Sequence, residues 1–364
     1  MVSGKIVLLC AGGTGGHLFP AEALAGALVP LGFRPHLATD ERVERYTGTF
    51  AWEDIHVIRS ETMRSRAPLA MANTLWQLGT GTLAAWRMLG RLRPAVVCGF
   101  GGYPTLPPLT AAAWRKIPTM IHEANAVMGR ANRMLAPKVT RIATGFADVA
   151  MMDDVPKSKL VHTGNPVRPA VMEAAKVPYP DLDGPINLLV FGGSQGAAVM
   201  SSIVPPAIAR LDEQLRRRLR IVQQARQEDL AAVRGTYAGL GVTAEVSDFF
   251  RDLPARIAGA HLVISRSGAS TVAELSVIGR PSILVPLPGA LDQDQAANAR
   301  TLANVNGARM VMQPDFTAET LAADLTALLG DPVGLQAMAV NARDAGIPDA
   351  AGRLADWVVK LAAM

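Results

Sequence analysis

The chain contains 364 residues, of which 49% are apolar and 18% are charged, and its formal net charge is +5. This length predicts about two domains, and the composition excludes a globally disordered chain. The two cysteines, Cys10 and Cys98, are too few for a disulfide framework and are predicted to be reduced thiols in the core. Because neither a signal peptide nor an apolar run long enough to span a membrane is recognisable, we expect a cytoplasmic protein.

Basic residues are concentrated in the first half of the chain. Residues 1–164 carry 18 Lys and Arg against 11 Asp and Glu. Between Arg59 and Arg141 there are 12 basic residues and only two acids, Glu61 and Glu123. This block indicates an anionic partner, which is a nucleic acid, an anionic membrane surface or a phosphorylated substrate.

Strands alternate with helices along the chain, which is the pattern of an α/β fold with mostly parallel sheets. In the first half, apolar runs predict strands at residues 6–10, 34–39, 95–98 and 119–122. Helices are predicted at residues 20–31 and 69–92, although Gly79 and Gly81 weaken the longer one. In the second half, strands are predicted at residues 187–191, 220–224, 243–246, 262–265 and 282–286, with helices between them.

One motif occurs twice. Residues 5–16 (KIVLLCAGGTGG) resemble residues 186–196 (INLLVFGGSQG), and each segment reads as a strand, a glycine turn and the start of a helix. The matching glycines, Gly12 and Gly192, lie 180 positions apart, which is about half the chain. The repeat predicts two Rossmann-like domains joined near residues 164–169, and ligands often bind where two such domains meet.

Both glycine loops are candidate anion sites, because backbone N–H groups at a helix start attract phosphate. The first loop is neither the GxGxxG fingerprint nor a P-loop, which disfavours a dinucleotide oxidoreductase. His17 closes this loop and could accept a proton or contact a phosphate. In the second loop, the Ser194 hydroxyl could donate to a phosphate. The alternative is a tight βα turn, with His17 and Ser194 as structural caps.

Polar side chains also follow other predicted strands. Thr271 and Glu274 have the spacing of a capping box, although Glu274 could instead accept hydrogen bonds from ribose hydroxyls. The loop at residues 288–299 could bind sugar hydroxyls or a metal, or could be simply solvated. His122 and Glu123 could be catalytic or could belong to a buried polar network. The glycines of residues 99–105 could similarly form a binding loop or an ordinary turn.

Aromatic and basic residues adjoin each other on and after the long helix. Most apolar residues of this helix are expected in the core. Aromatic side chains next to arginines could instead rest in the headgroup layer of a membrane. The residues expected to make such a membrane contact are Trp76, Trp86, Arg87, Trp114 and Arg115.

Seven motifs, in this order, resemble the MurG family, the peptidoglycan N-acetylglucosaminyltransferases of glycosyltransferase family 28. They are residues 12–17, 101–104 (GGYP), 122–125 (HEAN), 163–168 (TGNPVR), 192–196, 267–274 (SGASTVAE), and Asp294–Gln295 with Asn298. The resemblance implies an α/β GT-B fold, in which two Rossmann-like domains with parallel sheets face a central cleft. It also implies an acceptor- and membrane-facing domain at residues 1–164 with 349–364, and a UDP-GlcNAc-binding domain at residues 165–348.

The same resemblance implies a reaction. GlcNAc would pass with inversion from UDP-GlcNAc to the C4 hydroxyl of MurNAc in undecaprenyl-pyrophosphoryl-MurNAc-pentapeptide (lipid I), giving lipid II. This step belongs to cell-wall synthesis and so to cell shape and division. The expected location is peripheral, on the anionic cytoplasmic face of the inner membrane, together with other cell-wall proteins. No nucleic acid, cofactor or metal is expected.

Roles for single residues follow from the resemblance as well. His17 is the expected general base, with Glu123 or His122 as alternatives. Glu274 would bind the ribose, Gln295 the GlcNAc hydroxyls, and Arg168 with Phe250 the uracil. The residues of the first domain expected to contact the donor sugar or the acceptor are Thr14, Gly15, Gly16 and Asn125. Those expected to bind the donor are Arg168, Ser194, Phe250, Ala269, Ser270, Thr271, Glu274 and Gln295.

Two other classes of function remain open. A different GT-B sugar-nucleotide enzyme, such as a UDP-GlcNAc 2-epimerase, would share the glycine loops but would not need a basic surface that faces lipid. A non-enzymatic scaffold or a nucleic-acid binder would explain the basic block but would leave the glycine loops and the Gln295 cluster without a role.

Overall fold

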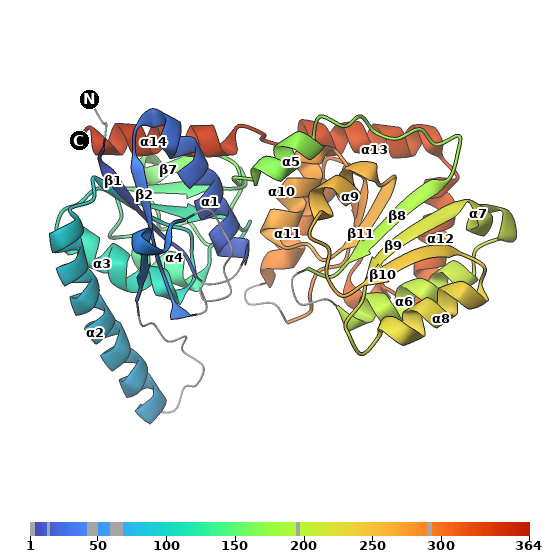
Figure 1. Ribbon diagram of the computed structural model, residues 1–364, viewed down its shortest axis with the longest axis horizontal. Helices are drawn as coiled ribbons and strands as arrows, with labels where there is room; N and C mark the ends of the chain where they lie inside the picture. The colour runs from blue at the N-terminus through green and yellow to red at the C-terminus, as the bar shows by residue number, and fades with distance from the viewer. Residues whose placement is uncertain (1–3, 13–14, 42–49, 59–67, 194–196, 290–292) are drawn as a thin grey trace. The chain divides into compact units, whose positions relative to one another are not determined.

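The computed structural model describes residues 4–12, 15–41, 50–58, 68–193, 197–289 and 293–364. Its contacts divide the chain into two compact units (Figure 1). Unit 1 comprises Met1–Arg168 and Pro348–Met364, and unit 2 comprises Pro169–Ile347. The boundary between the units therefore lies between Arg168 and Pro169.

Unit 1 contains a seven-stranded sheet in the order β3-β2-β1-β4-β5-β6-β7, and every strand pair in it is parallel. Its strands are β1 (Ile6–Cys10), β2 (Arg34–Thr39), β3 (Ile55–Val57), β4 (Val96–Gly99), β5 (Thr119–Glu123), β6 (Arg141–Thr144) and β7 (Leu160–His162). Its helices are α1 (Gly15–Leu28), α2 (Pro68–Leu92), α3 (Leu106–Trp114), α4 (Arg130–Leu135) and α14 (Ala350–Ala362). Short 3-10 turns lie at Val29–Leu31, Trp52–Asp54, Tyr103–Thr105 and Lys157–Lys159.

Helices cover both faces of this sheet, because successive side chains of a strand point to opposite sides. Leu9 packs in one core layer with α1 and with Leu354 and Val358 of α14, which lie one helical turn apart. Leu8 packs in the other layer with α2 and α3, for example with Leu109. Figure 1 shows the C-terminal α14 lying beside the N-terminal α1.

Unit 2 contains a six-stranded parallel sheet in the order β10-β9-β8-β11-β12-β13. Its strands are β8 (Ile186–Phe191), β9 (Leu219–Gln224), β10 (Thr243–Ser247), β11 (Leu262–Ser265), β12 (Ser282–Leu284) and β13 (Ala308–Met310). Its helices are α5 (Pro169–Ala174), α6 (Ala198–Ala209), α7 (Glu213–Arg218), α8 (Leu230–Gly239), α9 (Leu253–Gly259), α10 (Ala269–Ile278), α11 (Asp294–Ala303), α12 (Ala318–Leu329) and α13 (Pro332–Asp344), with a 3-10 turn at Gln313–Asp315. Leu188 and Val190 of β8 face a core formed with α6, α8 and α12.

Most of the long apolar runs are strands, as predicted, and α2 stays helical through Gly79 and Gly81. The predicted helix at residues 20–31 is wrong at both ends, because α1 begins at Gly15 and ends at Leu28. Pro20 lies inside α1, where it removes one backbone hydrogen bond, rather than at the first position. Four short strands were not predicted, namely β3, β6, β7 and β13.

Both cysteines are buried and unbonded, which confirms the prediction of core thiols. Burial raises the pKa of the Cys10 and Cys98 thiols. No helix in the described part of the chain is long and apolar enough to cross a membrane.

Candidate functional site

Each sheet reverses its strand order at one point, and the glycine loops lie at these two points. In unit 1 the reversal falls between β1 and β4, and in unit 2 between β8 and β11. In open α/β sheets, ligands bind outside the carboxyl ends of the strands at such a point. The repeated sequence motif therefore corresponds to a repeated position in the fold.

In unit 1, the His17 imidazole packs on the turn that follows β4. A Cβ atom added to Gly101 would lie 3.4 Å from the Nε2 atom of His17, and one added to Gly102 would lie 3.4 Å from its Nδ1 atom. Both glycines have left-handed backbones, with φ of 90° and 81°. The Gly12 N–H also donates to the Gly101 carbonyl at 3.3 Å. Glycine is thus favoured at both positions, because a side chain at such a φ would strain the turn. An added Cβ would be in van der Waals contact with the imidazole.

Glu123 ends β5, and its carboxylate is 2% exposed. It accepts hydrogen bonds from the backbone N–H groups of Asn125 (3.0 Å) and Gly129 (2.9 Å) and from Nδ2 of Asn132 (2.8 Å). Burial raises the pKa of this carboxyl, and the three donors oppose that rise. The arrangement favours the buried polar network over a catalytic carboxylate.

His122 is buried beside Glu123 and faces the segment before the unit boundary. Its Nε2 lies 3.0 Å from the Gly164 carbonyl, and because a carbonyl only accepts, Nε2 carries the proton. Burial lowers the pKa of His122 to about 4, so the ring is neutral near pH 7. Nδ1 has no hydrogen-bond partner within the described residues. A neighbouring bond from Asn165 Nδ2 to the Ala124 carbonyl, at 3.0 Å, also joins the HEAN and TGNPVR motifs.

The other expected residues of unit 1 lie around the same strand ends. Gly15 and Gly16 are the first two residues of α1, and Thr14 lies outside the described residues. The Arg168 guanidinium lies over the Phe19 ring of α1, 4.4 Å from its centroid. Arg168 belongs to unit 1, whereas Phe250, its expected companion at the uracil, belongs to unit 2.

In unit 2, α10 begins directly after β11, and its first helical hydrogen bond runs from Val272 to Gly268. The predicted capping box is wrong, because the N-cap is Gly268 and Thr271 is already the third helical residue. Glu274 lies one turn further on and is 7% exposed. The N–H groups of Ala269, Ser270 and Thr271 thus form the N-terminus of a helix at the switch point, which is an anion-binding geometry. Ser194 of the other glycine loop lies outside the described residues.

Hydrogen bonds brace three strand-end loops around this helix start. Ser267 Oγ donates to the Gln295 carbonyl (2.8 Å), and Asn298 Nδ2 donates to the Ser267 carbonyl (3.2 Å). Gln295 Oε1 accepts from the Leu287 N–H at 3.0 Å. Gln295 is therefore a structural brace at the position where a sugar-binding role was expected. Arg266 is another brace, which no sequence pattern indicated. Its Nη1 donates to the carbonyls of Val285 and Pro286, each at 3.0 Å.

Phe250 follows β10, the edge strand of unit 2. Its ring is 9% exposed and lies under the Arg256 guanidinium, 4.3 Å from the centroid. Arg256 in turn pairs with Glu245 and Asp252. The preceding Phe249 is 59% exposed. Within the described residues, no group of three or more His, Cys, Asp or Glu could hold a metal ion.

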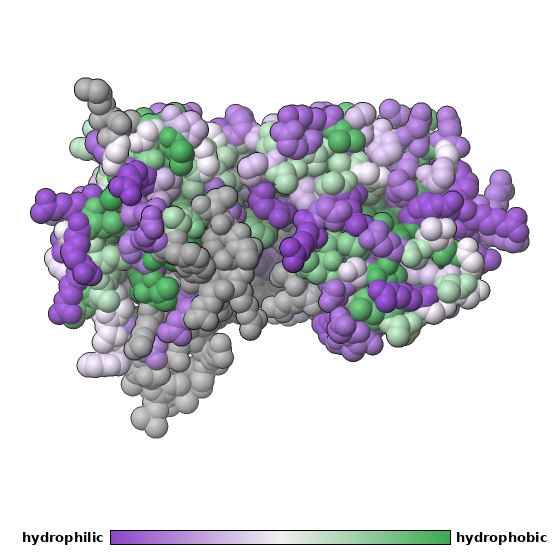
Figure 2. Space-filling view, in the orientation of Figure 1, coloured by the Kyte–Doolittle hydropathy of each residue, from purple (hydrophilic) through white to green (hydrophobic). Residues whose placement is uncertain are grey.

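The aromatic residues expected at a membrane lie on α2 and α3. Trp76 on α2 and Trp114 at the end of α3 are 73% and 63% exposed, so neither lies in the core. Leu89 of α2 is buried. Arg115 lies over the Trp86 ring at 4.1 Å and donates to its carbonyl at 3.0 Å. Figure 2 shows strongly hydrophilic and strongly hydrophobic residues side by side over this end of unit 1.

Comparison with known proteins places this geometry in a family. The glycosyltransferase family 28 N-terminal domain matches residues 7–144, and the family 28 C-terminal domain matches residues 187–354. The UDP-N-acetylglucosamine–N-acetylmuramyl-(pentapeptide) pyrophosphoryl-undecaprenol N-acetylglucosamine transferase of Rhodopseudomonas palustris is 57% identical over 100% of both chains.

Solved structures agree. The crystal structure of Acinetobacter baumannii MurG matches with a TM-score of 0.79 and 31% identity, over 98% of this chain and 99% of that one. A UDP-GlcNAc 2-epimerase from Neisseria meningitidis, bound to UDP-GlcNAc, has a TM-score of 0.70 at 14% identity, over 98% of this chain and 100% of that one, and shows the fold alone. This chain belongs to the MurG family within glycosyltransferase family 28, and it has the GT-B fold that its sequence predicted.

Proposed function

We propose how this chain performs the reaction of its family. The chain is an N-acetylglucosaminyltransferase that uses UDP-GlcNAc and lipid I and forms lipid II. The identity of 57% over the whole length with a relative named for this reaction carries the assignment. Acceptor-dependent release of UDP, with a disaccharide product, tests it. UDP-GlcNAc binding without acceptor-dependent turnover would instead favour an epimerase-like reaction.

Unit 2 binds UDP-GlcNAc in this proposal. The N–H groups at the start of α10 and the Ser194 hydroxyl would hold the diphosphate, because a helix N-terminus favours negative charge. Glu274, one turn into α10, would accept hydrogen bonds from the ribose hydroxyls. Gln295 would bind the GlcNAc hydroxyls and also hold the Leu287 loop through the bond described above.

Unit 1 supplies the base. The C4 hydroxyl of MurNAc must lose its proton as its oxygen attacks the anomeric carbon and UDP leaves on the opposite face, which inverts that centre. We assign the proton to His17, because its ring is only partly buried at the strand ends. Glu123 and His122 are buried, and their hydrogen bonds hold the β5 end in shape.

We further propose that unit 1 docks on the anionic cytoplasmic face of the inner membrane. Trp76, Trp86 and Trp114 would enter the headgroup layer, with Arg87 and Arg115 beside them. Each basic residue near such a surface contributes about 1 kcal/mol.

Charge reversal tests this docking. R87E should reduce binding to vesicles that contain anionic phospholipid about 30-fold, because it changes the charge by two units at about 1 kcal/mol per charge. Turnover with a water-soluble acceptor should remain at the native value. Flotation of the variant with vesicles at the native level would contradict the docking surface.

A further inference from the structure

An apolar groove of about 490 Å³ opens between α2, α3 and α4 of unit 1. Membrane contact does not account for the concave shape of this groove. Exposed tryptophan side chains can insert into a headgroup layer from a flat or convex surface. The volume lies within the range of pockets that hold a single ligand, about 300–1,000 Å³. The residues that line it are Leu78, Gly79, Thr82, Leu83, Trp86, Leu106, Pro107, Thr110, Trp114, Met134 and Lys138.

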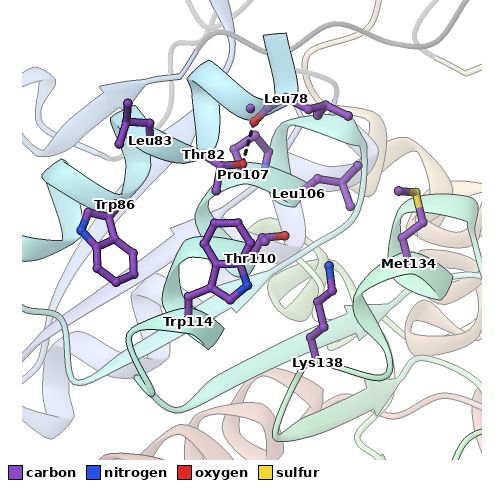
Figure 3. Close-up of a pocket in the computed structure, with 11 residues that line it drawn as sticks. Leu78, Thr82, Leu83, Trp86, Leu106, Pro107, Thr110, Trp114, Met134 and Lys138 are labelled. Atoms are coloured by element: carbon purple, nitrogen blue, oxygen red, sulfur yellow. Dashed lines mark hydrogen bonds between the residues drawn. The ribbon is translucent and has the colours of Figure 1, made fainter. Parts of the chain in front are cut away.

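The walls of the groove suit a hydrocarbon chain with a charged end. Apart from Lys138 and two threonines, the lining is apolar or glycine, and the Thr82 hydroxyl is already bonded to the Leu78 carbonyl at 2.6 Å. Figure 3 shows the Lys138 side chain directed toward the same space as Trp114 and Met134. The groove therefore offers dispersion contacts along its walls and one cation to an anionic headgroup.

The groove wall is joined along the chain to the proposed catalytic loop. Leu106 and Pro107, which line it, are the first two residues of α3 and follow Gly102 after a single 3-10 turn. That turn is fixed to Gly102, whose carbonyl accepts from the Thr105 hydroxyl at 2.7 Å. The turn on which His17 packs is thus followed directly by residues of the groove wall.

A second helix makes the same connection. Gly129, whose N–H binds the Glu123 carboxylate, immediately precedes α4. Met134 near the end of α4 and Lys138 beyond it line the groove. Two helices therefore begin at the candidate site and each lends side chains to the groove wall.

We infer that this groove binds the polyprenyl chain of the lipid-linked acceptor. The inference rests on the proposed function, in which the acceptor sugar reaches His17 and is joined to its chain through a diphosphate. A chain held beside the catalytic loop would position that sugar, and Lys138 would face the diphosphate. Selection of the acceptor would then depend on its chain as well as on its sugar.

Filling the groove tests the inference by kinetics. T110F places a ring inside the groove. The variant is assayed with two acceptors that have the same sugar and diphosphate. One acceptor carries the full polyprenyl chain and the other a short alkyl chain. The KM for the long-chain acceptor should rise roughly tenfold, as expected when about two methylene groups lose their contacts. The kcat and the KM values for UDP-GlcNAc and for the short-chain acceptor should stay at the native values.

A matched variant controls for the added ring. A84F adds the same side chain to an exposed position of α2 that does not line the groove, and it should leave all of these constants unchanged. An equal rise in KM for both acceptors in T110F would overturn the inference, because it would indicate a distorted site. Unchanged constants in T110F would overturn it as well.

Binding without turnover gives a second readout. Trp86 and Trp114 line the groove, so their fluorescence reports its occupancy. Farnesyl diphosphate should change the emission saturably in the native protein and not in T110F, whereas inorganic pyrophosphate should change neither. If T110F also lost binding to phosphatidylglycerol vesicles, in parallel with the rise in KM for the long-chain acceptor, the inference would be overturned. That result would indicate that the groove holds a phospholipid chain. Failure of the docking proposal would appear separately, as native vesicle binding by R87E.

Discussion

The two units place a glycine turn and a helix start at the same point of their sheets, yet they surround that point differently. In unit 1 an imidazole lies on the Gly101–Gly102 turn, beside a buried histidine and a buried carboxylate. In unit 2, amide, hydroxyl and guanidinium groups brace the loops around α10. One fold thus carries titratable side chains at this point in one unit and hydrogen-bonded loop braces in the other, and the difference lies in the loops rather than in the sheets.

Acid should lower the stability of unit 1 more than that of unit 2, and this is the largest difference in stability expected between the units. Burial lowers the pKa of four histidines, all in unit 1, namely His36, His56, His122 and His162. Their unfolded forms bind protons more readily, so the stability of unit 1 is complete above the unfolded pKa near 6.5 and is lost as pH falls toward 4. For His122 alone the loss approaches about 3 kcal/mol.

The tryptophans make this separation measurable. All five, Trp52, Trp76, Trp86, Trp114 and Trp357, belong to unit 1, so their emission follows that unit alone. In urea titrations at pH 7 and pH 4.5, the fluorescence midpoint of the native protein should fall more than the circular-dichroism transition of unit 2. H122Q keeps a donor for the Gly164 carbonyl but does not titrate, so its fluorescence midpoint should depend less on pH. Equal pH dependence in native protein and variant would contradict the role of His122.

Two glycines with left-handed backbones provide a matched pair with a smaller expected effect. Gly102 and Gly193 have φ of 81° and 88°, but a Cβ on Gly102 would meet His17 at 3.4 Å, whereas one on Gly193 would meet no described atom within 4 Å. Both G102A and G193A should lower stability by about 1 kcal/mol through backbone strain. Only G102A should also lower kcat, by about tenfold, because a backbone shift that relieves the strain at Gly102 would move the turn on which the His17 imidazole packs. An equal loss of kcat in both variants would show that the loss does not arise from the contact between this turn and His17.

Much of the fold could be predicted because long apolar runs report burial directly. The strands β1, β2 and β11 match their predicted residues, and the repeated glycine motif identified two similar sheets. The strands that were missed are three or four residues long and lie toward sheet edges, where no long apolar run is needed. Arg280 was also unpredictable, because a fully buried guanidinium whose donors all meet backbone carbonyls leaves no pattern in the sequence.

The site was predicted less completely, because spacing cannot tell a catalytic side chain from a bracing one. His122 and Glu123 were identified as polar groups at a strand end, and Gln295 as part of a polar loop that leads into a helix. Their hydrogen bonds join positions that are 6 to 42 residues apart in the chain. The capping-box spacing of Thr271 and Glu274 failed for a local reason. Gly268, without a side-chain oxygen, starts the helix three residues earlier. Only the three-dimensional contacts separate these roles.

The division of labour between the units is the central claim, and the UDP-GlcNAc affinity of two variants, measured beside their turnover, tests it most directly. H17A should bind UDP-GlcNAc with the native Kd and lose about 10²- to 10⁴-fold in kcat, the contribution of a general base. E274Q should weaken UDP-GlcNAc binding by about 10- to 100-fold, the effect of a hydrogen bond to a charged group. Weakened donor binding by H17A with little change in kcat, or native donor binding by E274Q, would contradict the assignment of chemistry to unit 1 and of the donor to unit 2.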